Sequence, residues 1–407
     1  MTHPRRGLQP EQPFSAALTD SRERVPPSFA PPKLSPSRPG PVQTRQATDS
    51  SLDPPRRGSS NPNIPRTSAS SPTSPRRRGA YTVRLMRHLA VLTSGGDAPG
   101  MNAAIRAVVR TAIYEGRRIS GSYRGYQGLV DGAVEELGAR SVANIIQRGG
   151  TILRTARCQD FYTPEGRSRA AATLRERGVD GLVVIGGDGS FRGATLLHAE
   201  HGFPVVGIPG TIDNDIYGTD VSIGFNTAMN IAVEAIDRLR DTAASHDRLF
   251  LAEVMGRHSG HIALNVGVAS GAEAILVPEA DLSADEIVRL IIGAQDRGKS
   301  SSIVVVAEGA YPGGALALQG AIETRCNYEV RTSILGHVQR GGSPSTRDRV
   351  LASRLGYTAV QALLAGETGV MVGVDKRGTV RVPLAEVFER KKVIDEELLH
   401  IAKVLAI

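Results

Sequence analysis

The 407-residue sequence has only two cysteines and no long apolar run, and each shortage excludes a class of protein. Cys158 and Cys326 have neither CxxC spacing nor a nearby histidine pair, which argues against structural zinc and indicates a reducing compartment. Because the N-terminal tail has no continuous apolar segment, we expect it to be neither a secretory signal nor a membrane span. We therefore expect a cytoplasmic protein with no membrane partner.

Proline and basic residues are concentrated at one end, because 16 of the 24 prolines precede residue 80. Residues 1–86 carry 14 Lys or Arg against 5 Asp or Glu, a charge of +9 in a chain whose total is +8. Almost no aromatic residues accompany this charge, so we expect no nucleic-acid partner. The proline content also argues against the amphipathic helix of a transit peptide. We expect a disordered Pro/Ser/Arg-rich extension, either a flexible appendage or an over-extended translation start.

Two common nucleotide motifs are also missing. No GxxxxGK[ST] sequence occurs, and no GxGxxG follows the first predicted strand, which excludes a Walker-type loop and a dinucleotide fingerprint. Three other glycine-rich turns follow apolar runs instead: TSGGDAPG at 93–100, GGDGS at 186–190, and TIDND at 211–215 after Pro209 and Gly210. Together they predict the floor of a phosphate site.

Short β-branched runs alternate with helical stretches from residue 87 onward. Strands are predicted at 89–93, 182–185, 205–208, 249–255, 274–277, 303–307 and 370–374, and helices at 101–115, 190–198 and 226–242. Apolar runs without polar alternation belong to parallel sheets covered by helices on both faces. The sequence therefore predicts an α/β fold, with ligands at the carboxyl ends of the strands and a helix directly after each glycine-rich turn.

The ordered part exceeds what a single core usually supports, so we expect two similar lobes with the site between them. The break falls near residues 222–225, and the chain crosses back near 336–342. These limits give one lobe of residues 87–223 plus 337–386 and another of residues 224–336 plus 387–407, with no close tandem repeat.

The glycine-rich turns favour phosphate binding because a residue without Cβ lets backbone N–H groups approach a phosphate, and a following helix adds partial positive charge. An ordinary strand-to-helix turn is the alternative for any one of them. A carboxylate beside a polyphosphate repels it unless a cation intervenes, which predicts Mg²⁺ at Asp188 and possibly Asp215. The alternative for Asp188 is a helix N-cap.

Asp213 is the predicted general base, because a hydroxyl that attacks phosphorus must lose its proton to a nearby acceptor. Thr211 is placed to orient the transferring phosphoryl group. An Asx turn at Asp213 and a plain cap at Thr211 remain the alternatives.

Fixed cations must neutralise the phosphoryl oxygens. Arg257 follows a strand that looks buried, where an unpaired guanidinium is costly, so we expect it to meet an anion, with a structural salt bridge as the alternative. His337 and Arg340, three residues apart beside two glycines, predict a site for a second phosphate on the substrate. His337 alone would be interpreted as a satisfied core or turn histidine.

These residues resemble the bacterial-type ATP-dependent 6-phosphofructokinases from about residue 87 to 403. The resemblance rests on LTSGGDAPGMNAAIR (92–106), RGGT (148–151), GGDGS, PGTIDND (209–215), MGR (255–257) and LGHVQRGGSP (335–344). It implies the phosphofructokinase fold, with the first lobe binding nucleotide and the second sugar phosphate. It also implies transfer from Mg-ATP to the 1-hydroxyl of fructose 6-phosphate, the committed step of glycolysis.

The resemblance further implies roles for single residues. Asp213 is the base, Thr211 and Arg257 contact the transferring group, and Asp188 holds magnesium. ATP contacts would come from Gly96, Arg157, Cys158, Gly187, Asp188, Gly189 and Ser190. Sugar-phosphate contacts would come from Met255, Gly256, Arg257, Glu308, His337 and Arg340. Arg248 and Arg331 would reach the neighbouring subunit's site, which implies a homo-oligomer, usually a tetramer; the alternative for both is a simple surface role.

Two glycines favour ATP over pyrophosphate as the donor. Relatives that use pyrophosphate have Asp in place of Gly189 and Lys in place of Gly210. A side chain at Gly189 would crowd and repel the α-phosphate of ATP, whereas Lys at Gly210 would supply charge that pyrophosphate needs. The remaining alternatives are a pyrophosphate-dependent enzyme, a diacylglycerol- or NAD-kinase-like enzyme, and a non-catalytic nucleotide-sensing subunit.

An allosteric site is also implied, at Arg106, Arg110, Arg240, Glu273, Arg297 and Lys299. The match is incomplete, because Ala139 replaces an arginine, and Ser300 and Ser301 replace a basic pair. Lost positive charge weakens anion binding, so the sequence leaves the response to effectors open.

Overall fold

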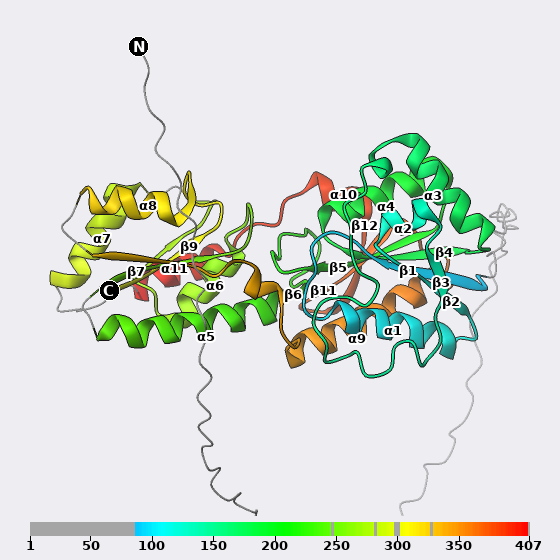
Figure 1. Ribbon diagram of the computed structural model, residues 1–407, viewed down its shortest axis with the longest axis horizontal. Coiled ribbons are helices and arrows are strands. Elements are labelled where there is room, and N and C mark those ends of the chain that lie inside the picture. The colour runs from blue at the N-terminus through cyan, green and yellow to red at the C-terminus, as the bar shows by residue number, and fades with distance from the viewer. Residues whose placement is uncertain (1–85, 246–247, 281–282, 297–301, 326–328, 406–407) are drawn as a thin grey trace, which may run out of the picture. The chain divides into compact units, whose positions relative to one another are not determined.

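The structure, a computed structural model, describes residues 86–245, 248–280, 283–296, 302–325 and 329–405 (Figure 1). The predicted extension, Cys326, Arg297 and Lys299 lie outside these ranges, apart from Met86. Within the ranges, no helix is long and apolar enough to cross a membrane.

The first sheet of the described residues has eight strands, in the order β12-β11-β5-β4-β1-β2-β3 with β6 paired to β5. Its strands are β1 (His88–Thr93), β2 (Arg118–Ser122), β3 (Val134–Glu136), β4 (Gly181–Gly186), β5 (Val205–Thr211), β6 (Ile223–Gly224), β11 (Val370–Asp375) and β12 (Gly378–Pro383). Only β3 and β12, at its two edges, pair antiparallel.

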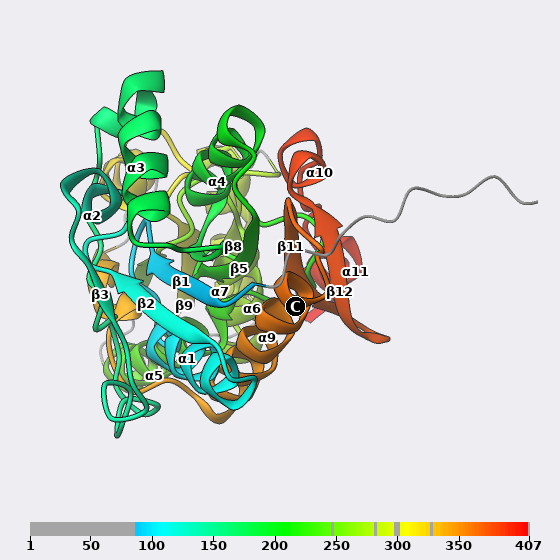
Figure 2. The same cartoon turned by 90° about the vertical axis from the view of Figure 1, so that its right-hand side faces the viewer.

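Helices cover both faces of this sheet because successive residues of each strand point to opposite sides. Leu89 and Val91 belong to one buried cluster, with residues of α1 (Met101–Tyr114) and α9 (Thr346–Leu364). Ala90 and Leu92 belong to another, with residues of α2 (Tyr126–Asp131), α3 (Pro164–Glu176), α4 (Asp188–His201) and α10 (Leu384–Glu389). Figure 2 shows α1 and α9 on one side of the strands, and α3 and α4 on the other.

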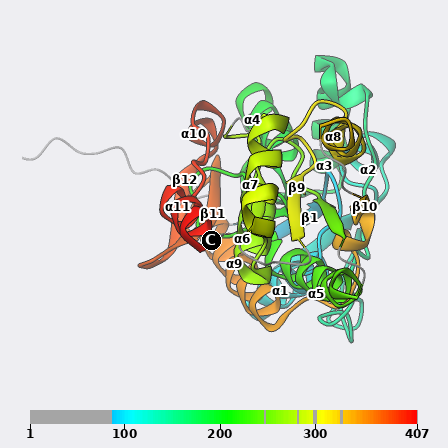
Figure 3. The ribbon, with the colours of Figure 1, turned by 90° about the vertical axis from the view of Figure 1, so that its left-hand side faces the viewer.

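The second sheet has four parallel strands among the described residues, in the order β10-β7-β9-β8. They are β7 (Leu249–Val254), β8 (Ala274–Leu276), β9 (Ser302–Ala307) and β10 (Val330–Ile334). Its faces are covered by α5 (Phe225–Ala244) and α6 (His261–Ser270) on one side, and by α7 (Ala284–Asp296) and α8 (Gly314–Glu323) on the other (Figure 3). The short helices η1 (Asp160–Tyr162) and η2 (Gly336–Arg340) and the C-terminal α11 (Glu396–Leu405), which packs on α6, complete the described elements.

The predicted fold class is confirmed: two mainly parallel sheets, each with helices on both faces. One detail of the prediction is wrong. β5 continues to Thr211, so Pro209 and Gly210 lie inside the strand, and the TIDND turn leads into β6 before α5 begins at Phe225. The third turn therefore does not lie directly before a helix.

Candidate active site

The three glycine-rich turns meet because β5, β4 and β1 are neighbours and all end at the same edge of the sheet. The backbone N–H of Ser94 donates to the carbonyl of Ile185 at 3.0 Å. A Cβ added to Gly186 would lie 2.5 Å from the carbonyl oxygen of Ser94, so only glycine allows this approach. A Cβ on Gly187 would lie 3.6 Å from the Cβ of Thr211. The second turn therefore lies directly beside the third.

Asp213 lies in this region and is only 6% exposed. Its backbone N–H donates to Thr211 Oγ1 at 3.2 Å, and its carbonyl accepts from Ser259 Oγ at 3.1 Å. The buried Oδ1 has no hydrogen-bond partner within the described residues. Burial raises the pKa of Asp213, while the nearby charges of Arg340 and Arg257 act in the opposite direction. The result is a carboxylate oxygen that can accept a proton.

The turn that carries Asp213 is held by the residue after it. Asn214 adopts a left-handed backbone conformation (φ 55°), and its Oδ1 accepts from the backbone N–H of Ser222 at 3.0 Å. Ser222 Oγ then donates to the carbonyl of Thr211 at 2.7 Å, which closes the segment on itself. Asparagine is one of the few residues that tolerate this backbone region, because its short polar side chain bonds locally.

Acidic side chains gather beside Asp213. Asp215 is accessible to solvent but surrounded by protein. This partial desolvation raises the pKa of Asp215, and the negative charge of Asp213 and the smaller effect of Asp188 raise it further. Asp188 is the first residue of α4 and pairs with Arg192 at 3.1 Å. Across the described ranges, no three His, Cys, Asp or Glu side chains form a metal-binding group by themselves. Mutual repulsion of these acids nevertheless fits a divalent cation that takes its other ligands from phosphate and water.

The end of β7 brings further predicted residues to the site. The backbone N–H of Arg257, at φ 57°, donates to Glu308 Oε2 at 3.1 Å across the ends of β7 and β9. The charges of both residues act on the pKa of Asp213, so they lie near it. The sequence argument from a buried guanidinium is wrong, because Arg257 is exposed. Gly256 has φ 149°, and a Cβ there would lie 2.3 Å from the carbonyl oxygen of Ser259.

Gln339 is a residue that the sequence reasoning missed. It is fully buried in η2, and its Oε1 accepts from the backbone N–H of Met255 at 2.9 Å. Gln339 thereby ties η2 to the end of β7. Its position between His337 and Arg340 was the available signal.

η2 contributes Arg340 and His337. Arg340 Nη1 donates to the carbonyl of Asp97 at 3.2 Å, and a Cβ on Gly96 would lie 2.6 Å from the same nitrogen. Arg340 therefore reaches the first glycine-rich turn as well as Asp213. His337 is exposed on η2, and no described contact joins it to the other residues of the site.

The predicted ATP contacts outside the turns differ in exposure. Arg157 is exposed and Cys158 is buried, and burial raises the pKa of the Cys158 thiol. A protonated buried thiol is a small apolar group here and not a nucleophile. Ser190 is buried in the first turn of α4, where its Oγ would lie 3.3 Å from a Cβ on Gly95. Gly189, beside it, would direct a Cβ into open space.

Arg248 and Arg331 lie away from this site. Arg248 directly precedes β7 and Arg331 is the second residue of β10, whereas Met255 follows the far end of β7. Six residues of strand separate these ends by about 20 Å. Both arginines pair with Glu329, Arg248 at 3.1 Å. The structure therefore does not bring them to Asp213 of the same chain.

The predicted effector residues form two described pairs. Arg106 and Arg110 are one turn apart on α1, and burial, followed by the charge of Arg110, lowers the pKa of Arg106. Arg240 donates to the carbonyls of Ser270 and Gly271 and lies 3.8 Å from Glu273. No described contact joins the pairs, and Arg297 and Lys299 lie outside the described residues.

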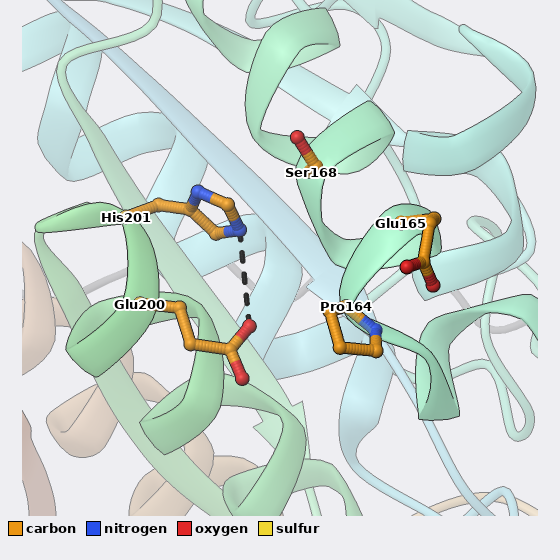
Figure 4. A pocket seen from close by; sticks show the side chains of 5 residues that line it. All are labelled: Pro164, Glu165, Ser168, Glu200 and His201. Atoms are coloured by element: carbon orange, nitrogen blue, oxygen red, sulfur yellow. Dashed lines mark ion pairs between the residues drawn. The ribbon is translucent and has the colours of Figure 1, made fainter.

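A separate cavity of about 530 Å³ lies between α3 and α4, lined by Pro164, Glu165, Ser168, Glu200 and His201 (Figure 4). Glu200 accepts from Arg167 Nε and Nη2 at 2.6 and 2.7 Å and lies 3.8 Å from His201. Glu200, which lines this cavity, is thus engaged in a structural ion pair with Arg167.

The fold and the acidic, glycine-lined site define the class of protein, an α/β phosphotransferase. The profile of the Phosphofructokinase family matches residues 88–363. The chain belongs to this family.

Curated relatives extend the match. ATP-dependent 6-phosphofructokinase 1 of Thermus thermophilus is 59% identical over 322 residues, which cover 79% of this chain and all of the relative. ATP-dependent 6-phosphofructokinase of Bacillus subtilis is 53% identical over the same length and coverage. Among solved structures, phosphofructokinase from Saccharomyces cerevisiae is 37% identical with a TM-score of 0.69. That alignment covers 78% of this chain but only 46% of the longer yeast chain.

Proposed function

We propose that this chain is an ATP-dependent 6-phosphofructokinase, which phosphorylates the 1-hydroxyl of fructose 6-phosphate and so catalyses the committed step of glycolysis. The observation that carries the proposal is the buried Asp213, whose Oδ1 has no hydrogen-bond partner among the described residues and lies where the three glycine-rich turns meet. Relatives 52–59% identical, all called ATP-dependent 6-phosphofructokinase, support the donor and the substrate.

In the proposed reaction, Asp213 Oδ1 accepts the proton of the 1-hydroxyl as the sugar oxygen bonds to the γ-phosphorus of ATP. The bond from that phosphorus to the β-phosphate oxygen breaks, and ADP leaves. The raised pKa of Asp213 suits this role, because a more basic carboxylate takes the proton more readily. Thr211 Oγ1, which holds the backbone of Asp213, also faces Gly187 of the phosphate-binding turn.

Cations near the acid neutralise the transferring group. Arg257 and Arg340 both lie close enough to Asp213 to act on its pKa, so a phosphoryl group beside that acid meets two guanidinium charges. We assign Arg257 to the transferring group, and Arg340 with His337 to the 6-phosphate. Met255, Gly256 and Glu308 would hold the sugar at the ends of β7 and β9.

Asp188 and Asp215 are the residues that would hold Mg²⁺ together with ATP. Desolvation chiefly raises the pKa of Asp215, and the negative charges of Asp213 and, to a smaller extent, Asp188 add to this effect. Bound magnesium would offset the charge of the phosphates there. The remaining contacts to ATP are assigned to Gly96, Arg157, Cys158, Gly187, Gly189 and Ser190.

Two glycines support ATP as donor. A Cβ on Gly189 would meet nothing within 4 Å, so the glycine leaves room in front of the second turn. A Cβ on Gly210 would lie 3.0 Å from Ile185 Cγ2 and 3.3 Å from Met101 Cε, so a lysine there would have to displace packed side chains. These positions disfavour the pyrophosphate-dependent alternative.

Three further assignments belong to the proposal. The first sheet, with residues 87–223 and 337–386, would bind nucleotide, and the lobe of residues 224–336 and 387–407 would bind sugar phosphate. Arg248 and Arg331 would serve the site of a neighbouring subunit in a homotetramer. Arg106, Arg110, Arg240 and Glu273, with Arg297 and Lys299, would form an effector site.

The test is a donor comparison with purified protein. Initial rates with fructose 6-phosphate and Mg²⁺ are measured with ATP and with pyrophosphate, each with and without phosphoenolpyruvate. We expect ADP formation with ATP and little turnover with pyrophosphate. Asp213→Ser should lower turnover about 10² to 10⁴-fold while sugar-phosphate binding is largely kept. Absence of ADP formation by the unaltered protein would overturn the proposal.

A further inference from the structure

The end of α10 and the segment after it contact the ion-pair partner of Asp188 and two residues that follow the Asp213–Asp215 turn in the chain. The Phe388 ring lies 5.6 Å from the guanidinium carbon of Arg192, the partner of Asp188. Arg390 lies over the Tyr217 ring at 5.4 Å and donates to its hydroxyl at 2.8 Å. Phe388 belongs to α10, and Arg390 and Lys392 lie in the segment that joins α10 on the first sheet to α11, which packs on α6 beside the second (Figure 1).

Lys392 makes the third contact. Its Nζ donates to the backbone carbonyl of Asp220 at 2.8 Å, and Asn214 Nδ2 donates to the same oxygen at 3.4 Å. Asn214 separates Asp213 from Asp215 in the chain. One carbonyl thus connects the C-terminal segment to the residue between the two acids, through side chains and without a covalent link.

The pKa values around Lys392 indicate which of the neighbouring groups is positively charged. Lys392 is half-buried, the charges of Asp220 and Asp215 act on its pKa, and its own charge acts on the pKa of His261 at the start of α6. Burial lowers the pKa of Lys392 to about 8, and burial with the charge of Lys392 lowers the pKa of His261 to about 4. At pH 7, Lys392 is therefore charged and His261 is neutral, so the lysine is the cation of this group.

We propose that Lys392 is a positioning residue for phosphoryl transfer, which holds the Asp213–Asp215 turn through the Asp220 carbonyl and the Asn214 amide. This inference rests on the proposed function. A turn displaced by about 1 Å can cost on the order of 100-fold in rate, because the base must lie within hydrogen-bond reach of the hydroxyl. The lysine is not among the residues assigned to either reactant, so its loss should affect kcat more than KM.

Three variants test the assignment. Lys392→Met removes the donor and charge but keeps the aliphatic length. Lys392→Arg keeps the charge at high pH, since a guanidinium stays protonated. Lys391→Met is the matched control, because Lys391 is the neighbouring exposed lysine. Steady-state kinetics from pH 6.5 to 9.5 and hydrogen–deuterium exchange of the 211–222 peptide are measured on each full-length protein.

We expect Lys392→Met to lower kcat about 10- to 100-fold with KM values changed less than about threefold, and to speed exchange of the 211–222 peptide. Lys392→Arg keeps a charged donor and should retain most of kcat. Lys391→Met should match the unaltered enzyme.

Unchanged kcat in Lys392→Met would overturn the inference, as would equal losses of kcat in the Met and Arg variants. If Lys392→Met fails to fold, Lys392→Gln replaces it, with the same expected loss of kcat and faster exchange of the 211–222 peptide. If the unaltered protein does not phosphorylate fructose 6-phosphate, the proposed function fails, and peptide exchange still shows whether Lys392 holds the turn.

Discussion

Asp213 illustrates how a reactive residue conflicts with stability. Its Oδ1 is buried without a hydrogen-bond partner among the described residues, a state that disfavours the ionised carboxylate. Arg340 and Arg257 compensate only in part, because the pKa of Asp213 remains raised. The side chain that gives the site its base therefore also lowers the stability of the fold at neutral pH.

This conflict predicts a stabilising substitution. The folded-state pKa of Asp213 is raised above its unfolded value, so its ionisation destabilises the fold at high pH, and the effect fades as pH falls through the raised pKa. Asp213→Asn should therefore raise the free energy of unfolding at pH 7.5 by about 0.5–2 kcal/mol and by less at pH 5. Urea unfolding at equal protein concentration measures this. A less stable variant at pH 7.5 would contradict the argument.

Gly189 allows a test of donor choice at a single position. Because a Cβ there meets open space, Gly189→Asp should leave the fold intact while placing a negative charge beside ATP phosphates. We expect KM for ATP to rise about tenfold or more, with the melting temperature within about 2 °C of the unaltered protein. Gly320→Asp is the control, because this exposed glycine of α8 also faces open space. Equal KM values in both variants would exclude the proposed role.

Helix α5, which leads from the first sheet to the second, begins at a buried carboxylate. Asp348 of α9 accepts from the backbone N–H groups of Gly224 and Thr227 at 2.9 and 2.8 Å, and from the Thr227 hydroxyl at 2.5 Å. It is fully buried, so it supplies the capping that α5 lacks at its own N-cap, Gly224.

Loss of this cap predicts a large destabilisation. Asp348→Asn replaces one acceptor oxygen with an NH₂ group that faces backbone donors, which should lower the free energy of unfolding by about 2–4 kcal/mol. Asp237→Asn removes the same charge from an exposed position on α5 and should change it by less than about 0.5 kcal/mol. Chemical denaturation of both variants makes the comparison. Similar losses would show that charge, not capping, matters.

Among the elements, most buried parallel strands were predicted, whereas the buried strand β2 and most edge strands were not. β1, β4, β5, β7, β8, β9 and β11 were found from apolar runs, because both faces of such strands are covered. β12 was not predicted because its residues alternate in exposure at the sheet edge. β6 was not predicted because it is only two residues long. Hydrophobic runs therefore identify the centre of each sheet better than its rims.

At the scale of the whole molecule, the positions of Arg248 and Arg331 bear on whether the active site is shared between subunits. Both lie at the amino ends of the strands β7 and β10, whereas Met255 and Arg257 follow the carboxyl end of β7. The active site of one chain therefore cannot use Arg248 and Arg331 of the same chain. If these arginines bind substrate, they do so across a subunit interface.

Shared sites predict complementation between inactive variants. Asp213→Ser and Arg331→Ala should each have little activity alone. When they are refolded together, a mixed pair contains one site with an intact Asp213 and an intact partner arginine, so about a quarter of unaltered activity should return. The same proteins mixed without unfolding serve as the control. Activity no higher than that of the separate variants would argue against shared sites.

The sequence alone determined the α/β class and the glycine-rich turns. Apolar runs and residues without Cβ depend on local backbone requirements, which are written in short stretches of chain. It also selected Asp213 as the candidate base.

Tertiary structure decided what depends on distant segments meeting. It placed Arg340 over Gly96, exposed the guanidinium of Arg257, and buried Gln339 against the backbone of Met255. It also brought Lys392 to the carbonyl of Asp220, a contact between residues 172 positions apart. No local pattern encodes such contacts, because burial and pKa depend on which strand ends and segments pack around a side chain.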